Sequence, residues 1–122
     1  MSLQTEKLEE LEKRIELLEF RQQLLYDNDE VSRLLFEYGI TQEQYRKIMD
    51  LMEEYRRQID DGHEVSHAAF EEAMYKIVPS HVSDYHMCEY IARAFMETGR
   101  WDEVFPALYG QMAKYQYMME KK

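Results

Sequence analysis

Glycine, proline and cysteine are scarce in this 122-residue sequence, which contains four glycines, two prolines and a single cysteine. Few glycines and prolines mean few breaks in regular secondary structure, and the abundance of Leu, Glu, Met and Lys favours helices over strands. Cys88 has no second cysteine with which to form an internal disulfide, which is typical of proteins of the reduced cytoplasm. We therefore expect an all-α cytoplasmic protein.

Positive charge is also in short supply, because 15 Lys and Arg residues stand against 25 Asp and Glu residues, giving a formal net charge of −10. The basic residues are scattered along the chain. A nucleic-acid surface needs clustered Lys and Arg to neutralise phosphates, and an anionic membrane surface needs the same. No apolar run is long enough for a transmembrane span or a signal peptide. We therefore expect neither a nucleic-acid partner nor a membrane partner.

Apolar residues that recur at spacings of three and four predict six helices. The helices should begin at capping residues such as Thr41, which forms a capping box with Gln44, and Ser66. They should end at glycines that can adopt a left-handed conformation, such as Gly39. Similar reasoning predicts a capping box of Asp27 with Glu30 and a cap at Ser83. The expected helices cover about residues 2–26, 28–38, 41–60, 66–78, 83–99 and 102–115.

The first predicted helix contains a heptad pattern of just over three repeats. Leu8, Ile15 and Gln22 occupy position a, and Leu11, Leu18 and Leu25 occupy position d. At 1.5 Å per residue the helix is about 37 Å long, more than a compact domain of this size usually needs. We therefore expect residues 1–26 to act as an oligomerisation helix and residues 27–122 to form a compact helical bundle. Together they make one structural domain.

Charged residues beside this pattern favour a parallel arrangement of copies. Lys7, Arg14 and Arg21 fall at position g, and Glu12 and Glu19 fall at position e. In parallel chains g faces the following e of the neighbour, whereas antiparallel copies bring like charges together. The segment from Arg14 to Glu19 also resembles a short motif of trimeric coiled coils, which favours three copies over two. A helix lying antiparallel against its own domain is the alternative. The predicted interface comprises Leu8, Leu11, Arg14, Ile15, Leu18, Glu19, Gln22 and Leu25.

Four histidines are the main candidates for chemistry. His63 and His67 are four residues apart, a spacing that can bind zinc on one helical face. The cap at Ser66 separates them, however, and the spacing of His81 and His86 matches no standard zinc motif. Cys88 lies on an apolar helical face, where we expect a buried thiol that is slow to react. We therefore expect no catalytic residue, cofactor or metal.

Tyrosine and methionine are abundant, with ten and nine residues respectively. Most of them fit a helical core, as Tyr45, Met49 and Met52 illustrate. The tail residues are harder to place in one small core, and tyrosine and methionine suit adaptable interfaces. We expect some of the tail residues to face a partner subunit: Tyr115, Tyr117, Met118 and Met119.

Several of these capping and core residues carry a resemblance to a known family. They are Leu34–Leu35, Gly39–Thr41 with Glu43, Met49, Gly62, Phe70 and the stretch 97–104. With them, the sequence resembles the YhaI-like family of small helical bacterial proteins over residues 8–115. Residues 81–90 match least well, and Pro106 departs from the pattern. The resemblance implies a multihelical fold in an intertwined trimer. It implies no activity and no site residues, because the family has no assigned function.

The sequence therefore predicts a non-catalytic homo-oligomeric protein, an adaptor or regulator that acts through protein–protein contacts. The alternative is an enzyme or metal-binding protein whose site forms between subunits from His63, His67, His81 or His86.

Overall fold

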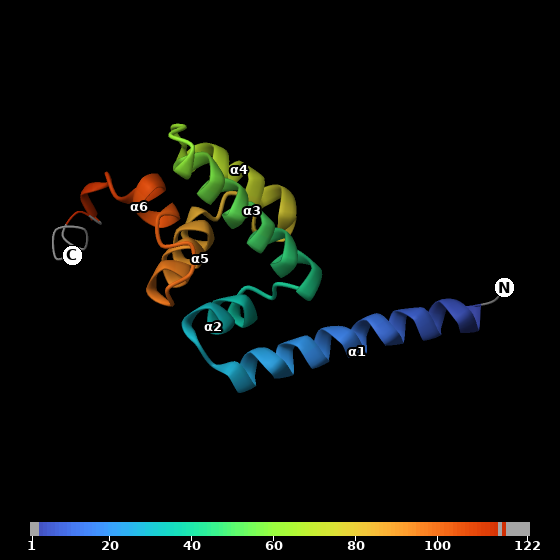
Figure 1. Cartoon of the computed structure of the whole chain (residues 1–122). Helices are drawn as coiled ribbons and strands as arrows, with labels where there is room; N and C mark the ends of the chain where they lie inside the picture. Colours follow the sequence, from blue (N-terminus) through green and yellow to red (C-terminus); the bar gives the residue numbers. More distant parts are fainter. Residues whose placement is uncertain (1–2, 115, 117–122) are drawn as a thin grey trace.

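The chain folds into six α-helices and one short 3₁₀-helix, as seen in a computed structural model that describes residues 3–114 and 116 (Figure 1). No strand occurs among these residues, so the all-α prediction is confirmed. The expected contacts of Tyr115, Tyr117, Met118 and Met119 lie outside the described residues. The elements are α1 (Leu3–Asp27), α2 (Glu30–Glu37), α3 (Gln42–Asp60), α4 (His67–Ile77), η1 (Pro79–His81), α5 (Tyr85–Glu97) and α6 (Val104–Tyr109).

Local sequence signals set most helix boundaries where they were predicted. The hydroxyl of Thr41 accepts the backbone N–H of Gln44, whose side chain accepts the N–H of Thr41, so the predicted capping box is confirmed. Ser66 accepts the N–H of Ala69 and caps α4. Gly39 follows α2 with a φ of 67°, a conformation in which a side chain would be strained. These contacts satisfy backbone groups that the helix ends leave unpaired.

Two predicted caps are wrong by one or two residues. The N-cap of α2 is Asp29, not Asp27, and its carboxylate accepts the N–H of Ser32 at 2.7 Å. Asn28 adopts a φ of 48° and turns the chain before Asp29. Similarly, α5 is capped by Asp84, because Ser83 has a φ of 70° and occupies the turn itself. The turn before α2 is therefore two residues longer than the local pattern indicated, and the turn before α5 is one residue longer.

The last predicted helix is interrupted at Gly110, and Ala113, Lys114 and Gln116 are helical again beyond the break. The apolar stripe indicated a helix from about residue 102 to 115, but α6 ends at Tyr109 and Gly110 is its C-cap. A Cβ added at Gly110 would meet the carbonyl oxygen of Pro106 at 2.5 Å, so this close turn requires glycine. Gly110 therefore ends the helix instead of merely weakening its middle.

The core surrounds α5, which contacts α2, α4 and α6. Ile91 and Phe95 of α5 are fully buried, as are Met52 of α3 and Phe70 of α4. Tyr55 and Phe70 pack edge to face with ring centroids 5.3 Å apart. This packing makes α2 to α6 the body of the protein, and α1 is joined to it mainly through α2. In Figure 1 the N-terminal part of α1 extends well beyond the other helices.

Candidate interaction surface

The exposed apolar side chains of this protein are concentrated on α1. Leu24 is the one residue of this 25-residue helix that is buried. Most of the large hydrophobic side chains exposed in the described residues also belong to this helix: Leu3, Leu8, Leu11, Ile15, Leu17, Leu18, Leu25 and Tyr26. So much apolar surface on one element is characteristic of an interaction site.

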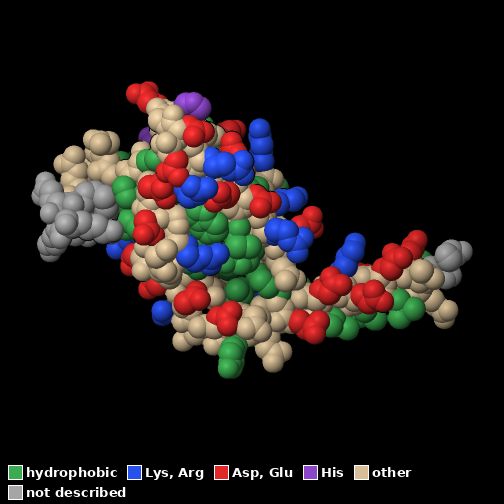
Figure 2. Space-filling view, in the orientation of Figure 1, with side chains coloured by type: hydrophobic (Ala, Val, Ile, Leu, Met, Phe, Trp, Pro, Cys, Tyr) green, Lys and Arg blue, Asp and Glu red, His purple; other side chains and the backbone are tan. Residues whose placement is uncertain are grey.

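Five of these side chains form a continuous row that also includes Gln22. We call these six residues the seam. The five apolar side chains are between 49% and 65% exposed, and Gln22 is exposed too. Hydrophobic side chains line the edge of α1 that faces away from the rest of the molecule in Figure 2. The seam residues are Leu8, Leu11, Ile15, Leu18, Gln22 and Leu25. The structure thus places all predicted interface residues, Arg14 and Glu19 included, at exposed positions of one helix.

The nearly opposite side of α1 attaches the helix to its own body. With 3.6 residues per turn, Phe20 and Leu24 lie about half a turn away from the seam. Leu24 is buried, and the ring of Phe20 lies 6.2 Å from that of Tyr45 in α3. Arg21 donates to the carbonyl oxygen of Phe36 at 3.3 Å, with its guanidinium 3.9 Å from the Phe36 ring centroid. The attachment to α2 and α3 therefore leaves the seam uncovered.

Arg21 differs from Lys7 and Arg14, the other basic residues at position g, because it contacts α2. Lys7 and Arg14, like Glu12 and Glu19 at position e, are exposed and make no ion pair with the described part of the chain. Their charges remain available for another molecule. Arg21 instead joins α1 to α2, a role that the heptad pattern alone could not indicate.

A cleft of about 820 Å³ lies between α1 and the body. Glu16 and Glu19 of α1 line one side, and Arg46 of α3 and Arg100 line the other. Arg100 is held by the hydroxyl of Tyr45 at 3.2 Å and lies over the ring of Trp101. No histidine or cysteine lines the cleft, so the candidate chemical residues from the sequence lie elsewhere.

The four histidines lie in four different surroundings. His63 is in the exposed loop before α4, and His67 is the first residue of α4, with its ring 5.8 Å from that of Tyr109. His81 Nε2 lies 2.8 Å from the carbonyl oxygen of Tyr38, a pairing that requires a proton on Nε2. The ring of His86 is tilted against that of Tyr85, with their centroids 4.2 Å apart. In the described part of the chain, no three His, Cys, Asp or Glu residues are grouped as metal ligands would be.

Cys88 is fully buried in α5, which confirms the predicted burial. Burial raises the pKa of its thiol to about 12, and the negative charge of Glu71 adds to this effect. Because the thiolate is the reactive form, we expect Cys88 to react slowly with thiol reagents at neutral pH.

Glu89 is a buried carboxylate whose burial was not predicted from the sequence. It is 1% exposed in α5, and its carboxylate lies 2.7 Å from Nζ of Lys114. This hydrogen bond raises the pKa of Lys114. The pairing joins the end of the described chain to the central helix, and such a long-range partner has no local signal in the sequence.

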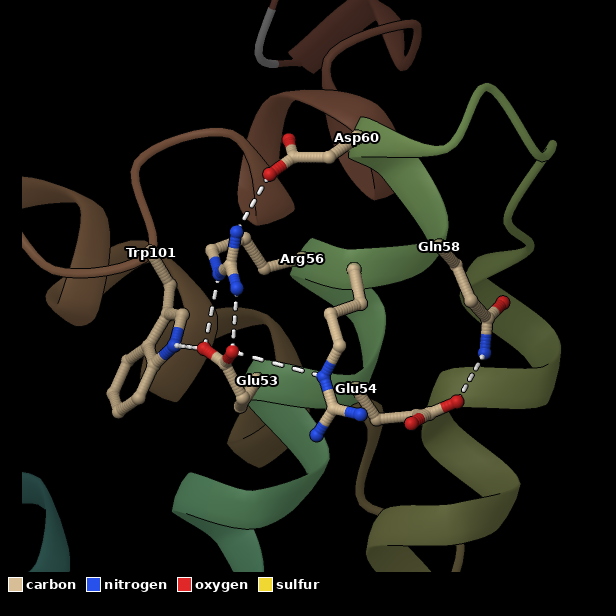
Figure 3. Close-up of polar contacts among 7 residues, drawn as sticks. Glu53, Glu54, Arg56, Gln58, Asp60 and Trp101 are labelled. Atoms are coloured by element: carbon tan, nitrogen blue, oxygen red, sulfur yellow. Dashed lines mark hydrogen bonds and ion pairs between the residues drawn. The ribbon is translucent and has the colours of Figure 1, made fainter.

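A cluster of polar side chains joins α3 to the turn between α5 and α6 (Figure 3). Glu53 accepts from Nε of Arg56 at 2.9 Å and from the indole N–H of Trp101 at 3.1 Å. Arg56 also pairs with Asp60 at 2.6 Å. Trp101 has a φ of 50°, an uncommon conformation for a bulky residue. Its bond to Glu53 and its edge-to-face contact with Phe95 hold it in place. The cluster therefore connects α3 to the turn before α6.

The contacts of Glu53 are expected to make the stability of the fold depend on pH. Hydrogen bonds from Arg56, and then from Trp101, lower the pKa of Glu53 to about 2 from an ordinary 4.5. A lowered carboxyl pKa stabilises the fold above pH 4.5, and the effect is lost as the pH falls toward 2. We expect Glu53→Gln to lower the melting temperature at pH 6, with a smaller difference at pH 3. Glu54→Gln is the control, because Glu54 is exposed and, among the described residues, its carboxylate accepts a hydrogen bond only from Gln58. Equal losses for Glu53→Gln at both pH values would contradict this assignment.

Comparison with protein-family models, curated proteins and solved structures found no match. The resemblance to the YhaI-like family stays a prediction. No helix among the described residues is both long and apolar enough to cross a membrane.

Proposed function

We propose that this protein is a non-catalytic, self-associating protein of the cytoplasm, in which copies join through α1. Three copies form a parallel coiled coil, and the assembly serves as an adaptor or regulator through protein–protein contacts. The observation that carries this proposal is the uncovered seam. Five apolar side chains at heptad spacing lie exposed on a helix whose other side already contacts its own body.

The second copy is the occupant that fits the seam best, because charge complementarity accompanies the apolar row. In a parallel coil, Lys7 and Arg14 of one chain face Glu12 and Glu19 of the next. Antiparallel copies would place Arg14 near Arg21 and Glu12 near Glu19, which repel each other. The position of the body on the other side of α1 leaves room for this arrangement. Three helices can therefore meet at the seam with their bodies outside.

An exchange of charges tests the pairing of Arg14 with Glu19. Arg14→Glu replaces up to three attractive pairs per trimer with repulsive ones, and each surface pair contributes about 0.5 kcal/mol. We expect the association constant to fall by about 10- to 100-fold. Adding Glu19→Arg to the same chain restores opposite charges and should recover most of the loss. Sedimentation equilibrium at low salt measures both changes.

Two further variants make this test specific. Lys13→Glu is the matched control, because Lys13 lies at the outer position f of the heptad and should leave the association unchanged. Glu19→Arg alone should weaken the oligomer about as much as Arg14→Glu. A double variant no stronger than either single variant would exclude the proposed pairing.

A further inference from the structure

Gln22 is the one polar residue inside the seam between Leu8 and Leu25. It is exposed, and its carboxamide makes no hydrogen bond within the described part of the chain. Leu18 and Leu25 lie about one helical turn away on either side. A carboxamide has two donors and one acceptor oxygen, and its burial is costly unless they are paired. The residue opposite Gln22 in a coil therefore affects the stability of an alignment more than the residue opposite any leucine does.

Parallel chains provide hydrogen-bond partners for the Gln22 carboxamide in one alignment only. When the chains are in register, Gln22 faces Gln22 of its neighbours, and the carboxamides can donate to one another around the axis. A slip of one heptad places Gln22 against Ile15, which offers no hydrogen bond. The slip therefore buries an unpaired amide, and it leaves Leu25 of one chain and Leu8 and Leu11 of the other without a leucine or isoleucine opposite them.

Antiparallel chains can pair the Gln22 carboxamide with another amide only by giving up apolar contacts along the seam. The alignment with full overlap places Leu8 opposite Leu25, and Gln22 then faces Leu11. A shift of one heptad brings Gln22 opposite Gln4, which is also at position d. That shift leaves Leu25 beyond the partner helix, so one apolar layer is lost.

We infer that Gln22 determines the register and direction of the coil formed by α1. This inference rests on the proposed self-association and adds a specificity-determining residue to it. The alternative alignments bury Gln22 without a partner or give up apolar contacts, and the in-register parallel coil does neither. A single polar residue at position a is known to specify alignment in this way, at a cost in stability. Replacing Gln22 with an apolar residue therefore removes the selection while strengthening the seam.

Distances between spin labels can reveal the alignment directly. A label at Glu9→Cys lies at the outer position b of the heptad, and Cys88 is buried, so the chain without Glu9→Cys serves as the labelling blank. With Gln22 present, we expect one narrow distribution of distances between copies. With Gln22→Ile, we expect a higher melting temperature and additional distances, because each heptad slip separates the labels by about 10 Å along the axis. Gln22→Asn retains an amide and should retain the single distribution.

The outcomes separate this inference from the proposed function. Gln23→Ile is the matched control, because Gln23 lies one residue outside the seam, and it should leave the distances unchanged. If Gln22→Ile keeps the single narrow distribution, the inference is wrong although self-association stands. If the chain with Gln22 shows no distances between copies at all, self-association fails and the inference fails with it.

Discussion

Replacing Leu18 with aspartate is expected to dissociate the assembly into single chains that remain folded. Leu18 is 65% exposed in the single chain, so its replacement removes almost no contact within the body. In the coil its burial contributes about 2 kcal/mol per chain, and a carboxylate at this position is costly to bury. With three chains changed at once, the association constant should fall by about four orders of magnitude or more. Light scattering gives the mass, and circular dichroism shows that the helices remain.

The neighbouring leucine supplies the control for this variant. Leu17 is 37% exposed and lines a hollow between α1 and the start of α3, away from the seam. Leu17→Asp introduces the same charge one residue away and should leave the mass unchanged. If Leu17→Asp and Leu18→Asp dissociate the assembly equally, the contact does not run along the seam.

Replacing Phe95 with alanine should produce the largest loss of stability in the body. Phe95 is fully buried near the end of α5 and packs edge to face against Trp101 at 5.0 Å. Removing a buried phenylalanine side chain leaves a cavity and typically costs about 3–5 kcal/mol. Urea denaturation followed by circular dichroism measures the free energy of unfolding. The concentration must be held constant, because association adds to apparent stability.

Tyr90 provides a control in the same helix. It is 40% exposed, so Tyr90→Ala should cost about 1 kcal/mol or less. A comparable loss for Phe95→Ala and Tyr90→Ala would mean that the core does not centre on the inner face of α5.

Local signals predicted the helices well because capping depends on neighbouring residues. Each capping residue bonds a backbone N–H three residues further along, as Thr41 does with Gln44 and Ser66 with Ala69. The positive φ of Gly39 needs no partner at all. Such roles are visible in the sequence. The errors arose where the chain reverses direction. Asn28 and Ser83 adopt positive φ angles in these turns, and in each case the aspartate that follows is the cap.

The exposure of the candidate interface residues was predictable for a related reason. A heptad pattern is a property of a single helix, and the structure leaves its residues exposed as the pattern requires. The role of Arg21 was not predictable, because its partner Phe36 is 15 residues away and is brought near by the turn after α1. Glu89 with Lys114 and Glu53 with Trp101 are hidden in the same way. Only folding brings these residues together.

The mass of the unmodified protein in solution tests the central proposal most directly. Light scattering on the chain at micromolar concentration should give about three times the single-chain mass of 14.9 kDa. That mass should fall on dilution as the coil dissociates. A mass equal to one chain across the micromolar range would contradict self-association through α1.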